Sequence, residues 1–484
     1  MNTTGVGFVV SSADVIANAE KAPTQDARCG RLRRQLSSFG VLLLTLSCLS
    51  PVFSIYGPGS DVLQHAGTGA ADLFLVGLAA AVVWALVYAE LGSAYPYAGG
   101  DYVGVGSILG PWAGFASLVI WGVTALPATA LLAKVITTYL SQIVPLASPT
   151  MTTFGSLGAA VAIALLAVRT STIVTGLFLA IETLAVLALI IGGLWHPVQP
   201  LLHVITHPQA LTSTGAWGPV APAVMALGAV TAAYATVGGN QAIAFGEELT
   251  EPHRHMGHVI LTACLIGAIA TALPVVAVVL STEEPRRVFS SAAPFTEFMT
   301  SLAGRNAGLA LSASVAAAIF NALIAQVMFC ARLFFSFGRD RVFPSKVSRA
   351  LARVHGRSGA PRVATIAVGI GSGACCLLDS HVLLVFISGL VVYSLALVSV
   401  AVLVGRLRGL TGQAAYWRSP WFPLAPILGL GLTLVFAVAD LLDAEVGRPS
   451  LLLMGALIVA ALLWHRFVLS KRPGGWAPRL PDRD

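Results

Sequence analysis

Charged residues are scarce in this chain of 484 residues. Lys and Arg number 28, and Asp and Glu number 21, so about 10% of the residues are charged, whereas a soluble domain carries about 25%. Apolar residues make up 56% of the chain, and the mean hydropathy is +0.84. So few charges cannot cover a water-exposed surface. The composition therefore excludes a set of soluble domains and indicates a protein embedded in a lipid bilayer.

The patterns that would indicate several other classes are also missing. None of the six cysteines belongs to a C-x-x-C pattern, so neither a zinc site nor a disulfide framework is expected. The formal charge is +7, but Lys134 is the only basic residue between Gln35 and Val168, which excludes a groove for nucleic acid. No grouping of nucleophile, base and orienting residue indicates an enzyme. We therefore expect no cofactor, no metal and no nucleic-acid partner.

Apolar segments long enough to cross a bilayer fill most of the chain. A crossing takes about 20 residues, and the segments are predicted at about 39–66, 71–95, 109–142, 152–169, 171–195, 218–247, 257–281, 307–337, 361–379, 382–405, 422–443 and 449–467. The polar N-terminal tail ends in RLRR and precedes a segment too long for a signal-peptide core. The fold class predicted is an all-α integral membrane protein with about 12 transmembrane helices.

The distribution of basic residues predicts the orientation, because Lys and Arg are retained on the cytoplasmic side. With the N-terminus inside, 23 basic residues are cytoplasmic and four are outside. Lys134 lies near the outer end of the third helix, where its side chain can snorkel outward. We therefore expect both termini in the cytoplasm and a plasma membrane location of the bacterial inner-membrane type.

Two of the predicted helices contain residues that interrupt a helix. In the first, CLSPVFSIYGPGS places Pro51 and then residues 57–59 inside the crossing, and in the sixth, YATVGGNQAIAFGEE places Gly238, Gly239 and Asn240 at a comparable depth. Non-helical backbone at this depth survives where it is buried in protein or lines a cavity. Interruptions at corresponding places in two halves favour a transporter built from inverted repeats with a site between them. The alternative is that these residues form proline kinks and close helix contacts.

A motif at the end of the second helix resembles the amino acid, polyamine and organocation (APC) superfamily of permeases. The family pattern A-E-L-x-S-x-x-P-x-x-G-G-x-Y, followed by G-P-x-x-G-F, is matched by Glu90, Leu91, Ser93, Pro96, Gly99, Gly100, Tyr102, Gly110, Pro111 and Gly114. The string GEELTEPHRHMG at 246–257 resembles the connection after the family's sixth helix. The string ARLFFSFGRDRVFPSKVSRAL at 331–351 resembles its exit from the eighth.

This resemblance, to permeases of the bacterial amino acid type, implies a fold and an activity. It implies a ten-helix core at 39–405, made of two inverted repeats of five helices with helices 1 and 6 broken. Two further helices at 406–468 and cytoplasmic tails at 1–38 and 469–484 complete the chain. The implied activity is secondary active transport of amino acids by alternating access. The chain departs from the family at both breaks. Many members have G-S-G-I-F in the break of the first helix, where this chain has residues 49–53 (LSPVF), and an acidic residue in the break of the sixth helix, where this chain has Asn240.

The two breaks are the expected substrate site. Amides after 50–53 can hold a carboxylate, and carbonyls of 235–238 can accept from an ammonium, so a zwitterionic amino acid satisfies both. Asn321, midway along the eighth helix, is a further candidate, with a helix-to-helix hydrogen bond as the alternative. The predicted substrate-binding residues are Ser50, Pro51, Val52, Phe53, Ala235, Gly238, Gly239, Asn240 and Asn321.

Glu182 is the predicted coupling residue. It lies near the middle of the fifth helix, where an isolated carboxylate costs at least about 2 kcal/mol and must be protonated, paired or facing water. The resemblance implies a charged residue beside the first break that is linked to proton coupling, so the proton is the expected coupling ion. The alternatives are a structural carboxylic acid and coupling to sodium.

Several charged and glycine residues are expected to have gating or structural roles. Glu247 and Glu248 end the sixth helix, where carboxylates oppose the helix dipole, and Arg254 or Arg332 is the expected partner in a cytoplasmic latch. The gating or structural set is Glu90, Gly99, Gly100, Glu248 and Arg332. Two rival functions remain: a polyamine or small-amine transporter or exchanger, disfavoured by the uncharged Asn240, and a membrane sensor, disfavoured by the short tails.

Overall fold

A computed structural model shows a helical bundle. The structure describes residues 36–145, 148–166, 171–212, 215–355, 360–414, 416–444, 447–472 and 476–478. Residues 1–35 of the predicted N-terminal tail and the last six residues lie outside this description. Within it, regular structure is helical except for β1 (Gln209–Leu211) and β2 (Trp217–Pro219), which form one antiparallel hairpin. The all-α prediction is confirmed.

The crossings correspond to the predicted segments. Nine described helical stretches are long and apolar enough to cross a membrane. One of them, Ser38–Ala94, contains two crossings, because a turn at Gly67–Gly69 separates α4 (Ser60–Ala66) from α5 (Ala70–Ala94). Two shorter apolar helices, α8 (Pro149–Leu166) and α17 (Arg362–Cys375), complete the twelve. The other long helices are α7 (Pro111–Ser141), α9 (Ser171–Trp195), α12 (Pro252–Ser281), α15 (Arg305–Arg339), α18 (Ser380–Leu407), α19 (Leu424–Leu442) and α20 (Gly447–Trp464), which ends in the π-helical turn η5 (His465–Leu469).

The first and sixth crossings are broken as predicted, but not at every predicted residue. The first consists of α2 (Ser38–Leu49), a break at Ser50, α3 (Pro51–Ser54), the π-helical turn η2 (Ile55–Gly59) and α4. The prediction that residues 57–59 also interrupt the helix is wrong, because the wider π turn accommodates Pro58 without ending the helix. The sixth consists of α11 (Pro222–Thr236) and the 3₁₀ helix η4 (Gly239–Glu248).

Several connections between the crossings contain short helices. The clearest is α6 (Asp101–Leu109), which precedes the third crossing and ends at Gly110 with φ 104°, a value that favours glycine. Pro111 then begins α7, at a position where its missing N–H costs nothing. The others are α10 (Leu201–Thr206), α13 (Pro285–Phe289), α14 (Pro294–Ala303) and α16 (Ser345–Leu351).

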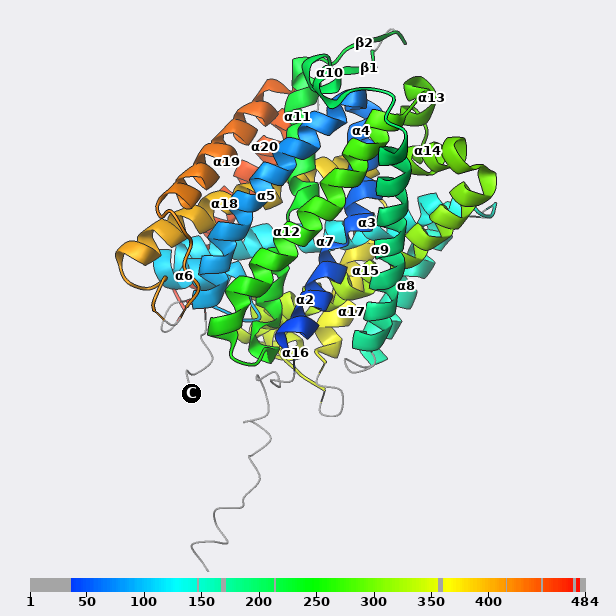
Figure 1. The fold of residues 1–484 in the computed structure, drawn as a ribbon. Coiled ribbons are helices and arrows are strands. Elements are labelled where there is room, and N and C mark those ends of the chain that lie inside the picture. The colour runs from blue at the N-terminus through cyan, green and yellow to red at the C-terminus, as the bar shows by residue number, and fades with distance from the viewer. Residues whose placement is uncertain are drawn as a thin grey trace, which may run out of the picture.

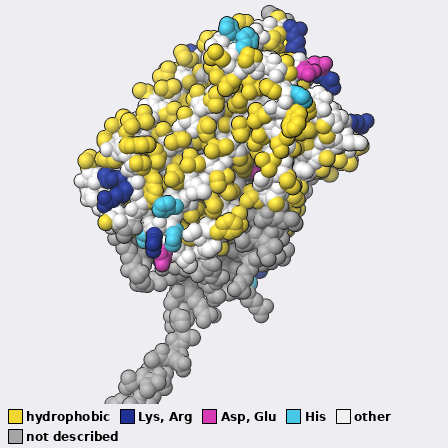
Figure 2. All heavy atoms as spheres, viewed as in Figure 1, with side chains coloured by type: hydrophobic (Ala, Val, Ile, Leu, Met, Phe, Trp, Pro, Cys, Tyr) yellow, Lys and Arg dark blue, Asp and Glu magenta, His cyan; other side chains and the backbone are white. Residues whose placement is uncertain are grey.

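The connections gather at two ends of the bundle, named here by their place in Figure 1. The upper end carries α10, α13 and the β1–β2 hairpin, and the lower end carries α16 and the start of α2. Figure 2 shows that hydrophobic side chains cover the broad middle of the visible face and that charged side chains lie near its ends. This distribution is that of a protein that spans a bilayer.

Lys134 binds the end of a neighbouring helix. Its Nζ donates to the carbonyl oxygen of Cys376 at 3.2 Å and also to that of Leu378. Both carbonyls follow the last residue of α17. The ammonium group of Lys134 therefore caps the carboxyl end of a short neighbouring helix, and the outward reach of this side chain toward the membrane surface stays a prediction.

The helices that carry the breaks are held close by small residues. At Gly77 of α5, an added Cβ would lie 2.8 Å from the carbonyl oxygen of Ala232 in α11. The Thr236 hydroxyl, in the last turn of α11, donates to the Gly77 carbonyl at 2.8 Å. Small residues allow this close backbone approach, and they fix the end of α11 from which the second break starts.

Candidate functional site

The first break is closed by the chain's own polar groups. Ser50 has φ 41°, and its hydroxyl accepts from the amide of Phe53 at 3.2 Å, which caps α3. The same hydroxyl donates to Glu182 Oε1 at 2.8 Å, and the amide of Val52 donates to that oxygen at 3.0 Å. The carboxylate of Glu182 thus lies where the sequence analysis expected a carboxylate of the substrate.

The second break lies directly against the first. Gly238 has φ 145°, and an added Cβ there would lie 3.2 Å from Leu49 Cγ, at the end of α2. Its carbonyl accepts from the amide of Gln241 at 3.0 Å. Gly239 packs against α12, because its added Cβ would lie 2.5 Å from Cys264 Sγ. Residues nearly 190 positions apart therefore meet at the centre of the bundle.

A cavity lies between the two breaks. The space in this cavity that water molecules can occupy has a volume of about 60 Å³. Because one water molecule needs about 10–15 Å³ of such space, a small solute fits. The lining includes the polar side chains of Ser54, Thr124, Asn240, Gln241 and Gln326, and none of the described lining residues carries a charged side chain. The remaining wall is mainly apolar, formed by residues that include Cys48, Leu49, Phe53, Trp121, Ala125, Ala128, Leu132, Tyr234, Val237, Gly238, Phe329, Ile387 and Val391.

Comparison with known proteins identifies the family. Residues 36–463 match the profile of the family described as amino acid permease. The chain belongs to the amino acid permease family. It is 25% identical over 417 residues to the branched-chain amino acid permease BcaP of Lactococcus lactis subsp. cremoris (strain MG1363), covering 78% of this chain and 84% of that protein. It is 27% identical over 366 residues to the Asc-type amino acid transporter 1 of Mus musculus, covering 71% and 66%.

Three of the residues predicted to bind substrate line the cavity of the permease: Phe53, Gly238 and Asn240. The side chain of Asn240 is oriented by Trp84, whose Nε1 donates to Asn240 Oδ1 at 3.2 Å. Trp84 also stacks on Tyr88, with ring centroids 4.7 Å apart. One tryptophan therefore fixes the amide of Asn240 in the cavity wall.

The other predicted residues lie behind the cavity wall. Ser50 and Val52 hold Glu182, Pro51 begins α3, and Ala235 is buried in α11. Asn321 is buried in α15, and its Nδ2 has no hydrogen-bond partner among the described residues. These residues do not contact the cavity in this conformation.

Two buried ion pairs join the lower half of the sixth crossing to α15. Arg332 Nε lies 2.6 Å from Glu248 Oε1, with side chains 6% and 9% exposed. Arg339 Nη1 lies 2.8 Å from Glu247 Oε1. Of the two partners predicted for these glutamates, Arg332 is the one that pairs, whereas Arg254 pairs with Glu251 at the surface.

Glu90 organises the connection between α18 and α19. It receives two bonds from Arg406, at 2.8 and 2.6 Å, one from the Thr411 hydroxyl at 3.0 Å and one from the Ser419 amide at 3.0 Å. The glycines of the same motif form the turn into α6, where Gly100 has φ 73°. Glu90 therefore holds the lower end together, whereas Gly99 and Gly100 line a second, smaller cavity.

Asp101 was missed by the sequence analysis. It lines a second, smaller cavity that shares Trp121, Asn240 and Phe329 with the first. Its Oδ2 accepts from Trp121 Nε1 at 2.6 Å and from the Tyr88 hydroxyl at 3.2 Å. An acidic residue directly after the glycine pair, where the chain re-enters apolar surroundings, is the signal that could have found it. The permease thus has a buried carboxyl group at the first break, that of Glu182, and another beside Trp121 of the cavity wall, that of Asp101.

Proposed function

We propose that this permease is a secondary active transporter that takes up a neutral, apolar amino acid by alternating access. The observation that carries the proposal is a cavity between two helix breaks whose described lining has no charged side chain. A zwitterion has no net charge, so helix ends and neutral polar groups can satisfy its two ionic groups. The apolar wall, with Leu49, Leu132 and Phe329, suits an aliphatic side chain. The relative named as a branched-chain amino acid permease supports the same substrate class.

A polyamine or small-amine substrate is the second candidate. Such a cation needs a carboxylate in contact with it, because burying an unpaired charge is costly. Asn240 stands where an acidic residue would have supplied that contact, and its amide oxygen is already used by Trp84. The cavity therefore favours the neutral zwitterion over the cation.

The proposed coupling ion is the proton, carried by Glu182. As a carboxylate, Glu182 satisfies the amide of Val52 and the hydroxyl of Ser50, at the positive end of α3. A protonated carboxyl group is a weaker acceptor and releases these donors. A carboxylate of the substrate can then take its place, so proton and substrate are bound together and carried together.

Uptake into proteoliposomes tests the activity. Purified permease is reconstituted, and the accumulation of labelled leucine, alanine, lysine and putrescine is measured with an imposed pH gradient, a sodium gradient or neither. We expect leucine to be concentrated when the lumen is alkaline and putrescine to be ignored. Accumulation of putrescine without leucine would overturn the proposed substrate class, and binding of leucine without accumulation under any gradient would favour a sensor.

The substitution Glu182→Gln tests the coupling role. Glutamine resembles the permanently protonated side chain, so the variant should bind leucine and exchange it across the membrane but lose accumulation driven by a pH gradient. Asp101→Asn is the matched control, because Asp101 is a second buried carboxylate and bonds to Trp121 in the cavity wall. If Glu182→Gln still concentrates leucine and Asp101→Asn does not, the proton is carried by Asp101 instead.

A further inference from the structure

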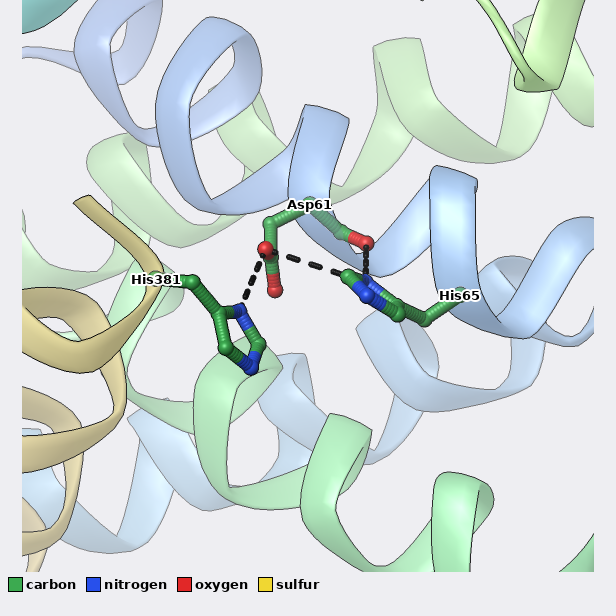
Figure 3. A group of neighbouring side chains, drawn as sticks. All are labelled: Asp61, His65 and His381. Carbon is green, nitrogen blue, oxygen red and sulfur yellow. Dashed lines mark hydrogen bonds and ion pairs between the residues drawn. The ribbon is translucent and has the colours of Figure 1, made fainter. Parts of the chain in front are cut away.

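Three potential metal ligands meet at the upper end of the bundle, away from the central cavity. Asp61 and His65 lie one turn apart on α4, and His381 is the second residue of α18. Figure 3 shows the Asp61 carboxylate between the two imidazole rings. The ligand atoms of all three side chains lie within 4.8 Å of one another, although 320 positions separate Asp61 from His381.

We propose that Asp61, His65 and His381 bind a divalent transition-metal ion of the Zn²⁺ type. Two imidazole nitrogens and one carboxylate oxygen form a ligand set that Zn²⁺ uses, with water in the fourth position. Ca²⁺ and Mg²⁺ prefer sites made of oxygen ligands, so the two histidines select against them. Other transition ions that bind imidazole belong to the same chemical class.

The spacing of the ligand atoms suits such an ion. Ligand atoms about 2.1 Å from a tetrahedral ion lie about 3.4 Å from one another. Asp61 Oδ1 lies 2.9 Å from His381 Nδ1 and 3.7 Å from His65 Nδ1, so the observed distances fall on both sides of the ideal value. His65 Nδ1 also bonds with the Asp61 carbonyl oxygen at 2.8 Å, and this bond is exchanged for the metal bond when the ion enters.

The site is accessible to an ion from solution. The side chains of His65, His381 and Asp61 are 56%, 35% and 20% exposed. Without the ion, the Asp61 carboxylate and the His381 ring already form one contact between α4 and α18. The backbone on the α18 side is fixed as well, because Asp379 accepts from the amide of His381 at 2.8 Å.

A bound ion would tether two elements that border the transport cavity. α4 continues the broken first crossing, which contributes Phe53 and Ser54 to the cavity, and α18 contributes Ile387 and Val391. Alternating access requires the cavity to open toward each end in turn. An ion that joins α4 to α18 therefore opposes opening at the upper end and inhibits transport. This consequence, unlike the site itself, rests on the proposed function.

Direct binding tests the site without any transport. Zn²⁺ is titrated into purified, chelator-treated permease by isothermal titration calorimetry, with His65→Ala, His381→Ala and Asp61→Asn as variants and His381→Gln as a variant of similar volume. Each change should weaken the affinity for Zn²⁺ by more than the 10–100-fold that is typical when a residue hydrogen-bonded to a metal ligand is lost. The double variant His203→Ala/His207→Ala is the control, because these two exposed rings, on and beside α10, also lie close together, 5.2 Å apart in a stacked pair.

The outcomes separate the site from its consequence. Unchanged Zn²⁺ binding in the variants, or loss of binding in the His203/His207 control alone, overturns the site. In proteoliposomes, Zn²⁺ should inhibit leucine uptake by the wild type reversibly, with recovery on adding EDTA, whereas His381→Ala should transport leucine in its presence. Zn²⁺ binding without inhibition of an active transporter overturns the tether, and Zn²⁺ binding by a protein that transports nothing overturns the proposed function but supports the site.

Discussion

The ion pair between Arg332 and Glu248 is expected to contribute strongly to stability, because it is almost completely buried. The two atoms lie 2.6 Å apart, and the side chains are 6% and 9% exposed. In Glu248→Gln the guanidinium group keeps its bond to the Met328 carbonyl at 3.1 Å and its place over the Phe245 ring, but its charge is uncompensated. Removal of one partner of a buried ion pair typically lowers the free energy of unfolding by about 3–5 kcal/mol, and we expect a loss of this size for Glu248→Gln.

A double-mutant cycle isolates the pair. Arg332→Met alone should leave a buried, unpaired carboxylate and lower the free energy of unfolding by about as much as Glu248→Gln does. The combination of Glu248→Gln with Arg332→Met leaves no unpaired charge. The double variant should therefore be more stable than the sum of the single losses predicts, with a coupling energy of about 2 kcal/mol or more. The neighbouring pair of Arg339 and Glu247 remains intact in all variants.

The surface pair of Arg254 and Glu251 is the matched control. Its atoms lie 3.6 Å apart, and its side chains are 77% and 66% exposed, so its coupling energy should lie between about 0 and 1 kcal/mol. The free energy of unfolding of both sets is measured in mixed micelles by denaturant titration, followed by tryptophan fluorescence. Equal coupling energies for the buried and exposed pairs would refute the reasoning from burial.

Three further outcomes are expected. Gly238→Leu should abolish leucine binding by the purified protein but leave membrane insertion intact. The reason is that a backbone with φ 145° is strained for any residue with a side chain, and the added Cβ would contact Leu49. Gly431→Leu, where the added side chain enters open space, should change neither leucine binding nor insertion. Asp379→Ala should lower the free energy of unfolding by about 0.5–2 kcal/mol through loss of the α18 cap. The amides of Val382 and His381 lower the pKa of the Asp379 carboxyl group, so this contribution is present at neutral pH and is lost as the pH falls through that lowered pKa. A cysteine placed at Lys346 should be labelled by an impermeant maleimide only after the cytoplasmic side is exposed, and labelling in intact cells would contradict the predicted orientation.

The crossings and the two breaks could be predicted because their signals are local. A run of apolar residues is long enough to cross, and Pro51 or the pair at Gly238 and Gly239 interrupts the helix at its own position. The turn with Pro58 shows the limit of this reasoning. A proline removes one hydrogen bond, but a break and a π turn both accommodate the loss, and the neighbouring packing decides between them.

The partners of the polar residues could not be predicted, because they depend on contacts between distant segments. Glu90 binds Arg406, which lies 316 positions away, and no periodicity connects the two. Glu182 lies midway along α9, as its position in the sequence indicates, but its bond to the amide of Val52 depends on the three-dimensional arrangement of α3 and α9. Asp101 looks like an ordinary residue in the first turn of a helix until the fold places Trp121 over it.

The short helix α17 has a consequence for the surrounding lipid. Its 14 residues span about 21 Å, whereas the hydrocarbon core of a bilayer is about 30 Å thick. Val363, Ile366 and Ile370 are exposed along one side of it, at 40%, 47% and 73%, so this side faces acyl chains. Such hydrophobic mismatch is relieved by local thinning of the bilayer or by polar groups that reach toward the headgroups. The lipid beside α17 is therefore compressed relative to the lipid beside the long helices α7 and α15, and shorter acyl chains are favoured at that face.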